Sequence, residues 1–245
     1  MMTAEFRIAA HKSRPRLGLR PYMLRLLVCL CALCAPVTLS YAKSFSNVID
    51  LLAERPYYLQ FQSGFASDAD FGPSLLFLLD RSEERTFHTG ISIGSQVADS
   101  LFGFDVDVVV FFGLQNFVEQ DFQPDSYGAT AYWKVYRQWA PRWLPARLPL
   151  RFGLGQGLSY ASRIPVSEQR DFEPDQSAET VHYLEWSVQF PVGGLLSLFG
   201  VQGGGVLDNT WFGYSIFHRS TVFGLFAEDG GGINYPGVAL EFVLD

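Results

Sequence analysis

The chain has 245 residues, with 18 Lys and Arg against 25 Asp and Glu, so its formal net charge is −7 at pH 7. This length suits one domain of moderate size. The acidic balance argues against nucleic acid as a partner, because a phosphate backbone is bound by a surplus of basic side chains.

The first 42 residues are typical of a bacterial secretory signal peptide. Six basic side chains precede a short apolar run at 26–34, and Ser40-Tyr41-Ala42 has the small-x-small pattern of a cleavage site. The apolar run is well short of the ~20 residues of a membrane-spanning helix, which disfavours a transmembrane anchor. Cleavage after Ala42 would leave 12 basic and 24 acidic residues and would remove all three cysteines.

Residues 43–56 are predicted to form a short helix or an ordered lead-in, which a proline ends. From Tyr57 on, apolar residues alternate with polar residues or glycine, which is the period of a β-strand. The clearest case is 102–112, where Phe and Val occupy one face and Asp105 and Asp107 lie on the other. In chain order, strands are expected over 57–62, 87–94, 102–112, 127–137, 149–161, 180–190, 211–220 and 233–244.

The two faces of these strands distinguish between two all-β folds. A soluble β-sandwich, the alternative, would rarely place charged residues such as Asp107 and Lys134 on one side of long strands. A transmembrane barrel has apolar side chains outside and polar ones within. We therefore expect an all-β, eight-stranded antiparallel up-and-down transmembrane β-barrel over 57–245. Inside it, Asp105 and Asp107 are expected to meet Lys134 or Arg151, since unpaired buried charge is costly.

The strand count depends on the apolar run at 74–79, which the sequence alone leaves open as a ninth strand. Bacterial single-chain barrels have an even number of strands with both termini in the periplasm. Parity therefore favours placing 74–79 in an outer loop. Outer loops are then expected at 67–85, 115–126, 162–179 and 221–232, and inner connections at 97–100, 138–148 and 191–209.

Other chemical motifs are weak. The glycines at 153–157 do not complete a nucleotide-binding loop, because Leu158 takes the place of the third glycine and no βαβ unit surrounds them. After loss of the leader no cysteine remains, and the only histidines are His88, His182 and His218. We expect neither a metal site nor a cofactor.

The strand at 211–220 carries His218 and Ser220, which are two residues apart and therefore share a face. Tyr214 and Ile216 lie on the same face and are typical of lipid-facing positions. Both polar side chains are thus expected outside the barrel, near its outer rim. An idle polar pair is costly in hydrocarbon, whereas a histidine that deprotonates a serine can attack an ester.

The segment 218–224, His-Arg-Ser-Thr-Val-Phe-Gly, is followed by 228–234, Glu-Asp-Gly-Gly-Gly-Ile-Asn. Here the sequence resembles the PagL-type lipid A 3-O-deacylase (acyloxyacyl hydrolase-like) family, whose motif runs His-x-Ser-Asn, a glycine, then a loop into the last strand. The resemblance is sharp over about 211–242 and only architectural elsewhere. It implies an eight-stranded barrel of the bacterial outer membrane, with a lipid-facing His–Ser–Glu triad acting on lipid A or lipopolysaccharide.

The resemblance also implies roles for individual residues. His218 corresponds to the general base and Ser220 to the nucleophile. The group that orients His218 is expected to be Glu228, Asp229 or Asn234, because the family's acid falls on or near Asn234. An asparagine can orient an imidazole but cannot stabilise an imidazolium by charge.

Two departures from the motif concern the oxyanion donors. Thr221 stands where the family has Asn, and Gly224 comes one residue late. The backbone near both residues, together with Arg219, is expected to supply oxyanion donors or to position the substrate.

Three further possibilities remain at the level of the sequence. The first is a non-catalytic structural or lipopolysaccharide-binding barrel, with His218 and Arg219 binding phosphates at the rim. The second is a small-solute pore, which is disfavoured because eight strands leave little lumen. The third is assembly of the barrel into a homodimer.

Overall fold

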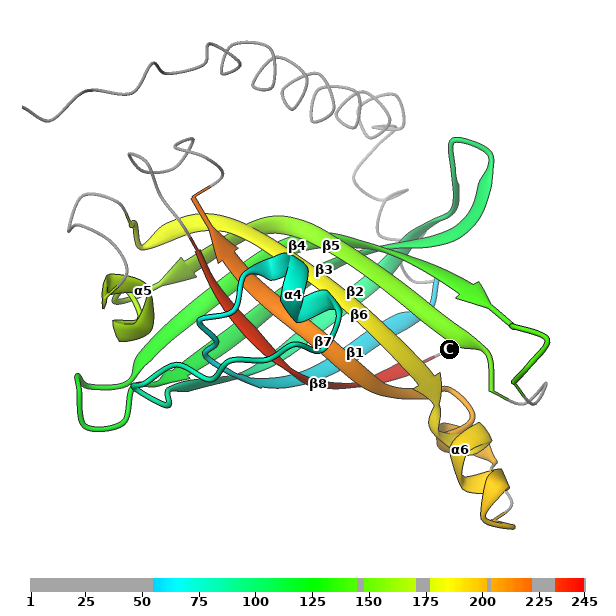
Figure 1. The fold of residues 1–245 in the computed structure, drawn as a ribbon. Helices are drawn as coiled ribbons and strands as arrows, with labels where there is room; N and C mark the ends of the chain where they lie inside the picture. The colour runs from blue at the N-terminus through cyan, green and yellow to red at the C-terminus, as the bar shows by residue number, and fades with distance from the viewer. Residues whose placement is uncertain (1–54, 145–147, 171–176, 202–203, 222–231, 245) are drawn as a thin grey trace, which may run out of the picture. The chain divides into compact units, whose positions relative to one another are not determined.

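The computed structural model describes residues 55–144, 148–170, 177–201, 204–221 and 232–244. Eight antiparallel strands in this part close into an up-and-down barrel, with each strand beside the next and β1 beside β8 (Figure 1). The predicted all-β eight-stranded barrel is therefore confirmed. The strands are β1 (Tyr57–Phe65), β2 (Phe87–Leu101), β3 (Phe104–Val118), β4 (Ser126–Trp139), β5 (Leu150–Ala161), β6 (Thr180–Pro191), β7 (Thr210–Ser220) and β8 (Gly232–Leu244).

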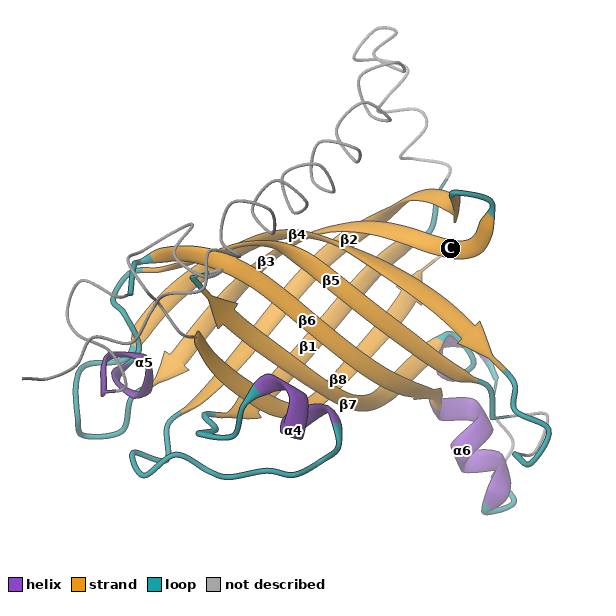
Figure 2. Cartoon of the chain, turned by 45° about the horizontal axis from the view of Figure 1, so that its top comes forward, coloured by secondary structure: helices purple, strands orange, loops and turns teal. Residues whose placement is uncertain are grey.

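Short helices occur in three of the connections (Figure 2). They are α4 (Phe71–Leu75) between β1 and β2, α5 (Val166–Arg170) between β5 and β6, and α6 (Val192–Leu198) with the 3-10 turn η1 (Gly205–Leu207) between β6 and β7. We call the end of the barrel that carries α4 and α5 the outer end, and the other the inner end. None of the helices in the described residues is long and apolar enough to cross a membrane.

Residues 74–79 lie in a loop, as the parity argument favoured, whereas the expected connection between β2 and β3 is wrong. Residues 74–79 form no strand, because Ser74 and Leu75 complete α4 and the chain then turns. The connection between β2 and β3 is only 102–103 rather than 97–100. Phe102 and Gly103 have φ angles of 51° and 81°, the two positive values that a tight type I′ hairpin needs. Alternation alone had assigned Phe102 to the strand.

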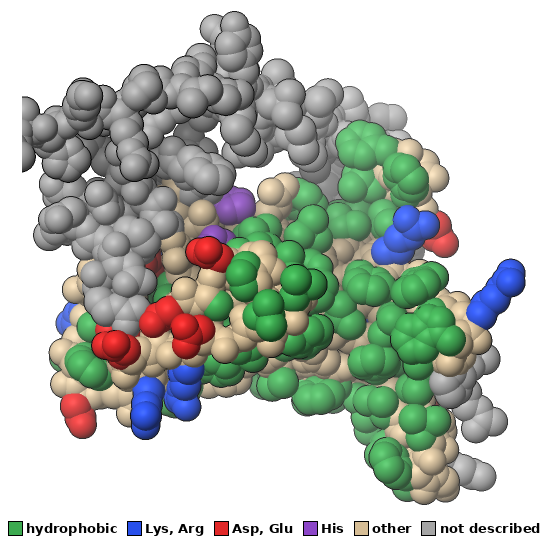
Figure 3. Space-filling view, in the orientation of Figure 1, with side chains coloured by type: hydrophobic (Ala, Val, Ile, Leu, Met, Phe, Trp, Pro, Cys, Tyr) green, Lys and Arg blue, Asp and Glu red, His purple; other side chains and the backbone are tan. Residues whose placement is uncertain are grey.

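The alternating pattern places apolar side chains outside the barrel and polar ones inside. Outward-facing Ile93, Phe112 and Leu114 are about two thirds exposed, at 60%, 64% and 67%. Figure 3 shows hydrophobic side chains covering much of the wall in this view, with charged side chains toward both ends and more of them at the end that carries α5. The polar side chains that are buried inside include Gln60, Lys134, Arg151, Glu185, Arg219 and Glu241.

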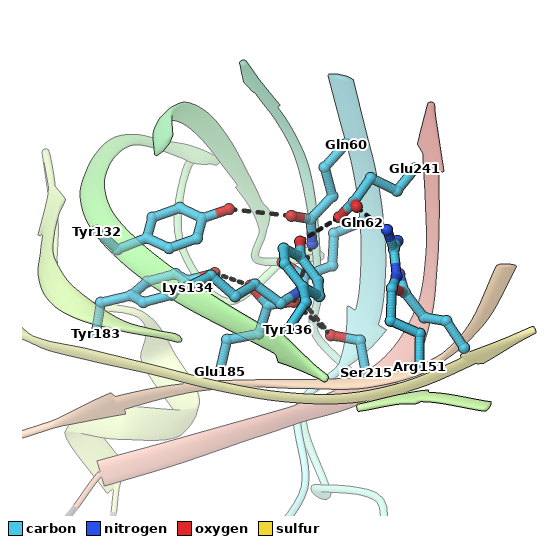
Figure 4. Close-up of polar contacts among 11 residues, drawn as sticks. Gln60, Gln62, Tyr132, Lys134, Tyr136, Arg151, Tyr183, Glu185, Ser215 and Glu241 are labelled. Carbon is cyan, nitrogen blue, oxygen red and sulfur yellow. Dashed lines mark hydrogen bonds and ion pairs between the residues drawn. The ribbon is translucent and has the colours of Figure 1, made fainter. Parts of the chain in front are cut away.

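Two ion pairs lie at the centre of the interior (Figure 4). Lys134 Nζ is 2.5 Å from Glu185 Oε1, and Arg151 Nη2 is 2.6 Å from Glu241 Oε1. The prediction that Asp105 and Asp107 would pair with these two cations is therefore wrong. Asp107 instead accepts a hydrogen bond from Gln96 Nε2 at 3.0 Å.

Glycine in the intervening strand explains the first pair. Gly155 of β5 lies between Lys134 of β4 and Glu185 of β6 in the register. Because Gly155 has no side chain, the lysine can cross the intervening strand and reach the carboxylate. An added Cβ at Gly155 would touch Lys134 at 3.4 Å and Glu185 at 3.5 Å.

Further polar side chains satisfy the two carboxylates. Glu185 accepts hydrogen bonds from Gln60, Tyr183 and Ser215 at 2.9, 2.7 and 3.2 Å. Glu241 accepts one from Tyr136 at 2.5 Å. A buried carboxylate is tolerated when it is both paired and hydrogen-bonded, so the interior is a filled polar core.

A third buried ion pair lies at the outer end. Arg219 Nε is 2.9 Å from Glu168 Oε2 of α5, and Arg219 Nη1 donates to Ser159 Oγ at 2.8 Å. The backbone N–H of Val166 donates to Glu119 Oε2 at 3.0 Å. These contacts fasten α5 to Arg219 of β7 and to Glu119, which directly follows β3.

Candidate functional site

His218 and Ser220 point outward from β7. The intervening Arg219 is fully buried in the interior, and consecutive strand residues point to opposite faces. Phe212, on the same face as His218, is 41% exposed. The two residues therefore lie on the outer wall, at the outer end of the strand, as the alternation predicts.

Cross-strand pairing brings two more polar residues to this place. Asn234 of β8 lies directly opposite His218, and His182 of β6 lies directly opposite Ser220. Opposite residues in an antiparallel pair have Cβ atoms ~4.5–5.5 Å apart. We call His182, His218, Ser220 and Asn234 the outer-face cluster.

A glycine leaves room for the imidazole of His218. Gly232 of β8 lies directly opposite Ser220 of β7. An added Cβ at Gly232 would lie 2.6 Å from Cε1 of His218 and 2.1 Å from the carbonyl oxygen of Arg219. A larger residue at 232 would therefore displace the histidine or the strand.

The β1–β2 loop (66–86) folds back over the outer-face cluster. The ring of Phe71 in α4 lies 5.3 Å from the imidazole of His218, measured between centroids. Asn234 Nδ2 donates to the carbonyl oxygen of Ala69 at 2.8 Å, and the N–H of Ser67 donates to the carbonyl oxygen of Asn234 at 2.9 Å. The loop thus covers part of the cluster, His218 and Asn234.

The hydrogen bond to Ala69 fixes the orientation of the side-chain amide of Asn234. Because Nδ2 is engaged with Ala69, Oδ1 is the atom that remains for His218. Oδ1 of Asn234 and Nδ1 of His218 are both buried and without a hydrogen bond of ordinary geometry in the described residues. An Nδ1–H on His218 and Oδ1 of its cross-strand neighbour are a complementary donor and acceptor.

Two of the remaining predicted residues, Arg219 and Thr221, lie in the described part of the chain. Arg219 points into the barrel and is held by Glu168, so it does not reach the outer face. Thr221 directly follows β7 and is buried. Gly224, Glu228 and Asp229 lie outside the described residues. Of the candidates for orienting His218, Asn234 is the one that the described structure places beside it.

His182 is the residue that sequence reasoning missed. It shares the outward face of β6 with Leu184 and Trp186, so alternation gives its direction. Its position beside Ser220 follows only from the register between β6 and β7, for which the sequence carries no local signal.

In the described residues, no group of three or more His, Cys, Asp or Glu is placed to hold a metal ion. No protein-family model matches the chain, and no similar curated protein or solved structure was found. The resemblance over 211–242 to the PagL-type family stays a prediction, and the function is inferred from the outer-face cluster.

Proposed function

We propose that this protein is a bacterial outer-membrane lipid A ester hydrolase of the 3-O-deacylase type. The observation that carries the proposal is that His218 and Ser220 share the outward face of β7, with Asn234 opposite His218. A serine beside a histidine on the outer wall of a barrel is positioned for a substrate whose acyl chains lie along that wall. Lipid A, with ester-linked acyl chains near a polar head group, is such a substrate.

The faces of the barrel and the leader support the membrane placement. Exposed apolar side chains such as Phe112 and Leu114 lie outside, while the ion pairs of Lys134 and Arg151 lie inside. This is the arrangement of an outer-membrane barrel. A cleavable leader at 1–42 would supply export across the inner membrane.

The chemistry follows from the two side chains. His218 takes the proton of Ser220 as Oγ attacks the ester carbonyl carbon, and the tetrahedral intermediate carries the negative charge on oxygen. When that intermediate collapses, His218 returns the proton to the departing sugar hydroxyl. Water activated by His218 then cleaves the acyl-serine and releases the fatty acid.

Further groups would support this reaction. Asn234 and Thr221 are among the residues that the structure describes, and Gly224, Glu228 and Asp229 are not. Asn234 orients the imidazole through Oδ1, without the charge that would stabilise an imidazolium. The carboxylates nearest to Asn234 in the sequence are Glu228 and Asp229, and these are the candidates to supply that charge. Backbone N–H groups near Thr221 and Gly224 are the proposed oxyanion donors.

Mass spectrometry of lipid A from cells that express the protein tests this proposal. We expect the wild type and an exposed serine control at the inner end, Ser100→Ala, to remove a 3-linked acyl chain. Ser220→Ala and His218→Ala are expected to leave lipid A intact at equal levels of folded barrel. Unchanged lipid A with the wild type, in a host whose lipid A carries that chain, would overturn the proposal.

A second candidate is a non-catalytic barrel that binds lipopolysaccharide. The cross-strand neighbour of His218 is an amide rather than a carboxylate, and Phe71 packs on the imidazole. In that case wild-type protein leaves lipid A intact, and His218→Ala weakens the retention of lipopolysaccharide on the purified barrel. Conductance in planar bilayers separately tests the small-solute pore, against which the filled interior argues.

A further inference from the structure

The β1–β2 loop has a second surface that the outer-face cluster does not explain. Residues 76–79, Leu-Phe-Leu-Leu, expose large apolar side chains, with exposed fractions of 72%, 58%, 62% and 43%. We call this run the apolar tip. Four consecutive exposed apolar residues are unfavourable in water and mark an interaction surface.

Contacts with Tyr214 fix the height of the apolar tip along the barrel wall. The ring of Phe77 lies 4.5 Å from the ring of Tyr214, and Tyr214 Oη donates to the carbonyl oxygen of Ser74 at 3.0 Å. Tyr214 precedes Ser220, the outer end of β7, by six residues. At ~3.3 Å per residue and a strand tilt of ~40°, the tip lies roughly 15 Å below that end.

This depth falls within the apolar band of a membrane barrel, which is ~25 Å tall. The wall beside the tip is apolar as well: outward-facing Val238, on β8 opposite Tyr214, is 47% exposed. In Figure 3 the hydrophobic side chains over α4, placed by Figure 1, continue onto the neighbouring wall. The tip and the wall therefore form one apolar surface.

Three of the backbone N–H groups of the tip have partners within the loop. The N–H groups of Leu76 and Leu78 donate to the carbonyl oxygen of Pro73, and that of Phe77 donates to Ser74. No residue from 71 to 79 carries a charged side chain. Backbone groups in a bilayer must be satisfied internally, and these three are.

The charged residues of the loop lie nearer its base. The N–H of Asp68 donates to the carbonyl oxygen of Asp80 at 2.8 Å, beside the bridge between Ser67 and Asn234. The loop thus joins a charged base at the outer end to an uncharged tip farther down the wall.

We propose that the β1–β2 loop is a membrane-inserted cover whose apolar tip takes the acyl chains of the surrounding lipid as its partner. Inserted there, the tip holds Ala69 and Phe71 against Asn234 and His218. A substrate then reaches the outer-face cluster from the lipid side. This inference rests on the membrane placement in the proposed function but not on ester hydrolysis.

Single nitroxide labels in liposomes test the cover. Full-length protein with Cys29, Cys31 and Cys34 changed to serine carries no cysteine, so one label can be placed at a time. The positions are Leu78→Cys in the tip and two references. Phe112→Cys reports the barrel wall, and Glu83→Cys reports an exposed residue nearer the base of the same loop.

Collisions with oxygen and with a water-soluble nickel complex distinguish lipid from water. We expect the labels at 78 and 112 to favour oxygen and the label at 83 to favour nickel. If the label at 78 favours nickel as the label at 83 does, while the label at 112 favours oxygen, the inserted loop is overturned and the membrane placement of the barrel stands. A label at 112 that reports water would overturn the membrane placement itself. Dipolar broadening between labels at 78 would instead identify a second copy of the chain as the occupant, which also overturns the proposal.

Discussion

Gly232 shows how one missing side chain shapes the outer-face cluster. A methyl group there would press on His218 and on the carbonyl oxygen of Arg219. We predict that Gly232→Ala lowers the proposed ester hydrolysis by up to about 100-fold, since a displacement of ~1 Å can cost that much. The measurement is fatty-acid release per folded barrel.

Gly157→Ala is the matched control for that substitution. Its added Cβ would lie 2.2 Å from the carbonyl oxygen of Ala131, so it produces a similar backbone clash on β5, two strands from His218. Both variants are expected to lose stability, but only Gly232→Ala should lose hydrolysis per folded molecule. Equal losses of hydrolysis would show that the space beside His218 is not the cause.

Two histidines flank Ser220, and their roles can be separated. We predict that His218→Gln lowers hydrolysis by about 10²–10⁴-fold, the usual contribution of a general base. His182→Gln should stay within about tenfold of the wild type, because the register places Asn234 opposite His218 and not opposite His182. The reverse order would identify His182 as the base.

At the scale of elements, α4 covers a strand to which it is not adjacent in sequence. Phe71 packs on the imidazole of His218. We predict that Phe71→Ala raises the rate of His218 modification by diethyl pyrocarbonate several-fold, because the reagent gains access to the ring. Peptide mass spectrometry of the refolded barrel measures the rate, and no esterase activity is required.

Two internal references belong to that experiment. Phe112→Ala removes an aromatic ring from the wall away from His218 and should leave its modification unchanged. His88 is fully buried inside the barrel and should stay unmodified in every variant. Equal rates in Phe71→Ala and the wild type would show that α4 does not shield His218.

At the scale of the whole molecule, the interior ion pairs join strands that are not neighbours, β4 to β6 and β5 to β8. Lys134→Met would leave Glu185 charged, buried and without its cation. We predict a loss of about 3–5 kcal/mol in the free energy of unfolding, as found when one partner of a buried pair is removed. Urea unfolding in lipid or detergent measures it.

Arg137→Met is the control on the same strand, because Arg137 is exposed near the inner end of β4. An exposed substitution of this kind should change stability by no more than about 0.5 kcal/mol. The double variant Lys134→Met with Glu185→Gln should recover part of the loss, since the uncompensated charge is gone. A Lys134→Met barrel as stable as the wild type would contradict the pairing.

The sequence by itself determined the strands, their faces and the direction of His218 and Ser220. Alternation is a local property: a residue's side of the sheet follows from its position along one strand. The even strand number of known barrels then favoured placing 74–79 in a loop, and the structure shows no strand there.

Only the tertiary structure decided which residues meet. Lys134 was expected to pair with an aspartate of the neighbouring strand, yet it crosses Gly155 to reach Glu185. His182 reaches Ser220, and Phe71 reaches His218, through strand register and loop packing. These contacts join residues far apart in the chain, so they depend on how the barrel closes and on where the β1–β2 loop lies, neither of which leaves a periodic signal in the sequence.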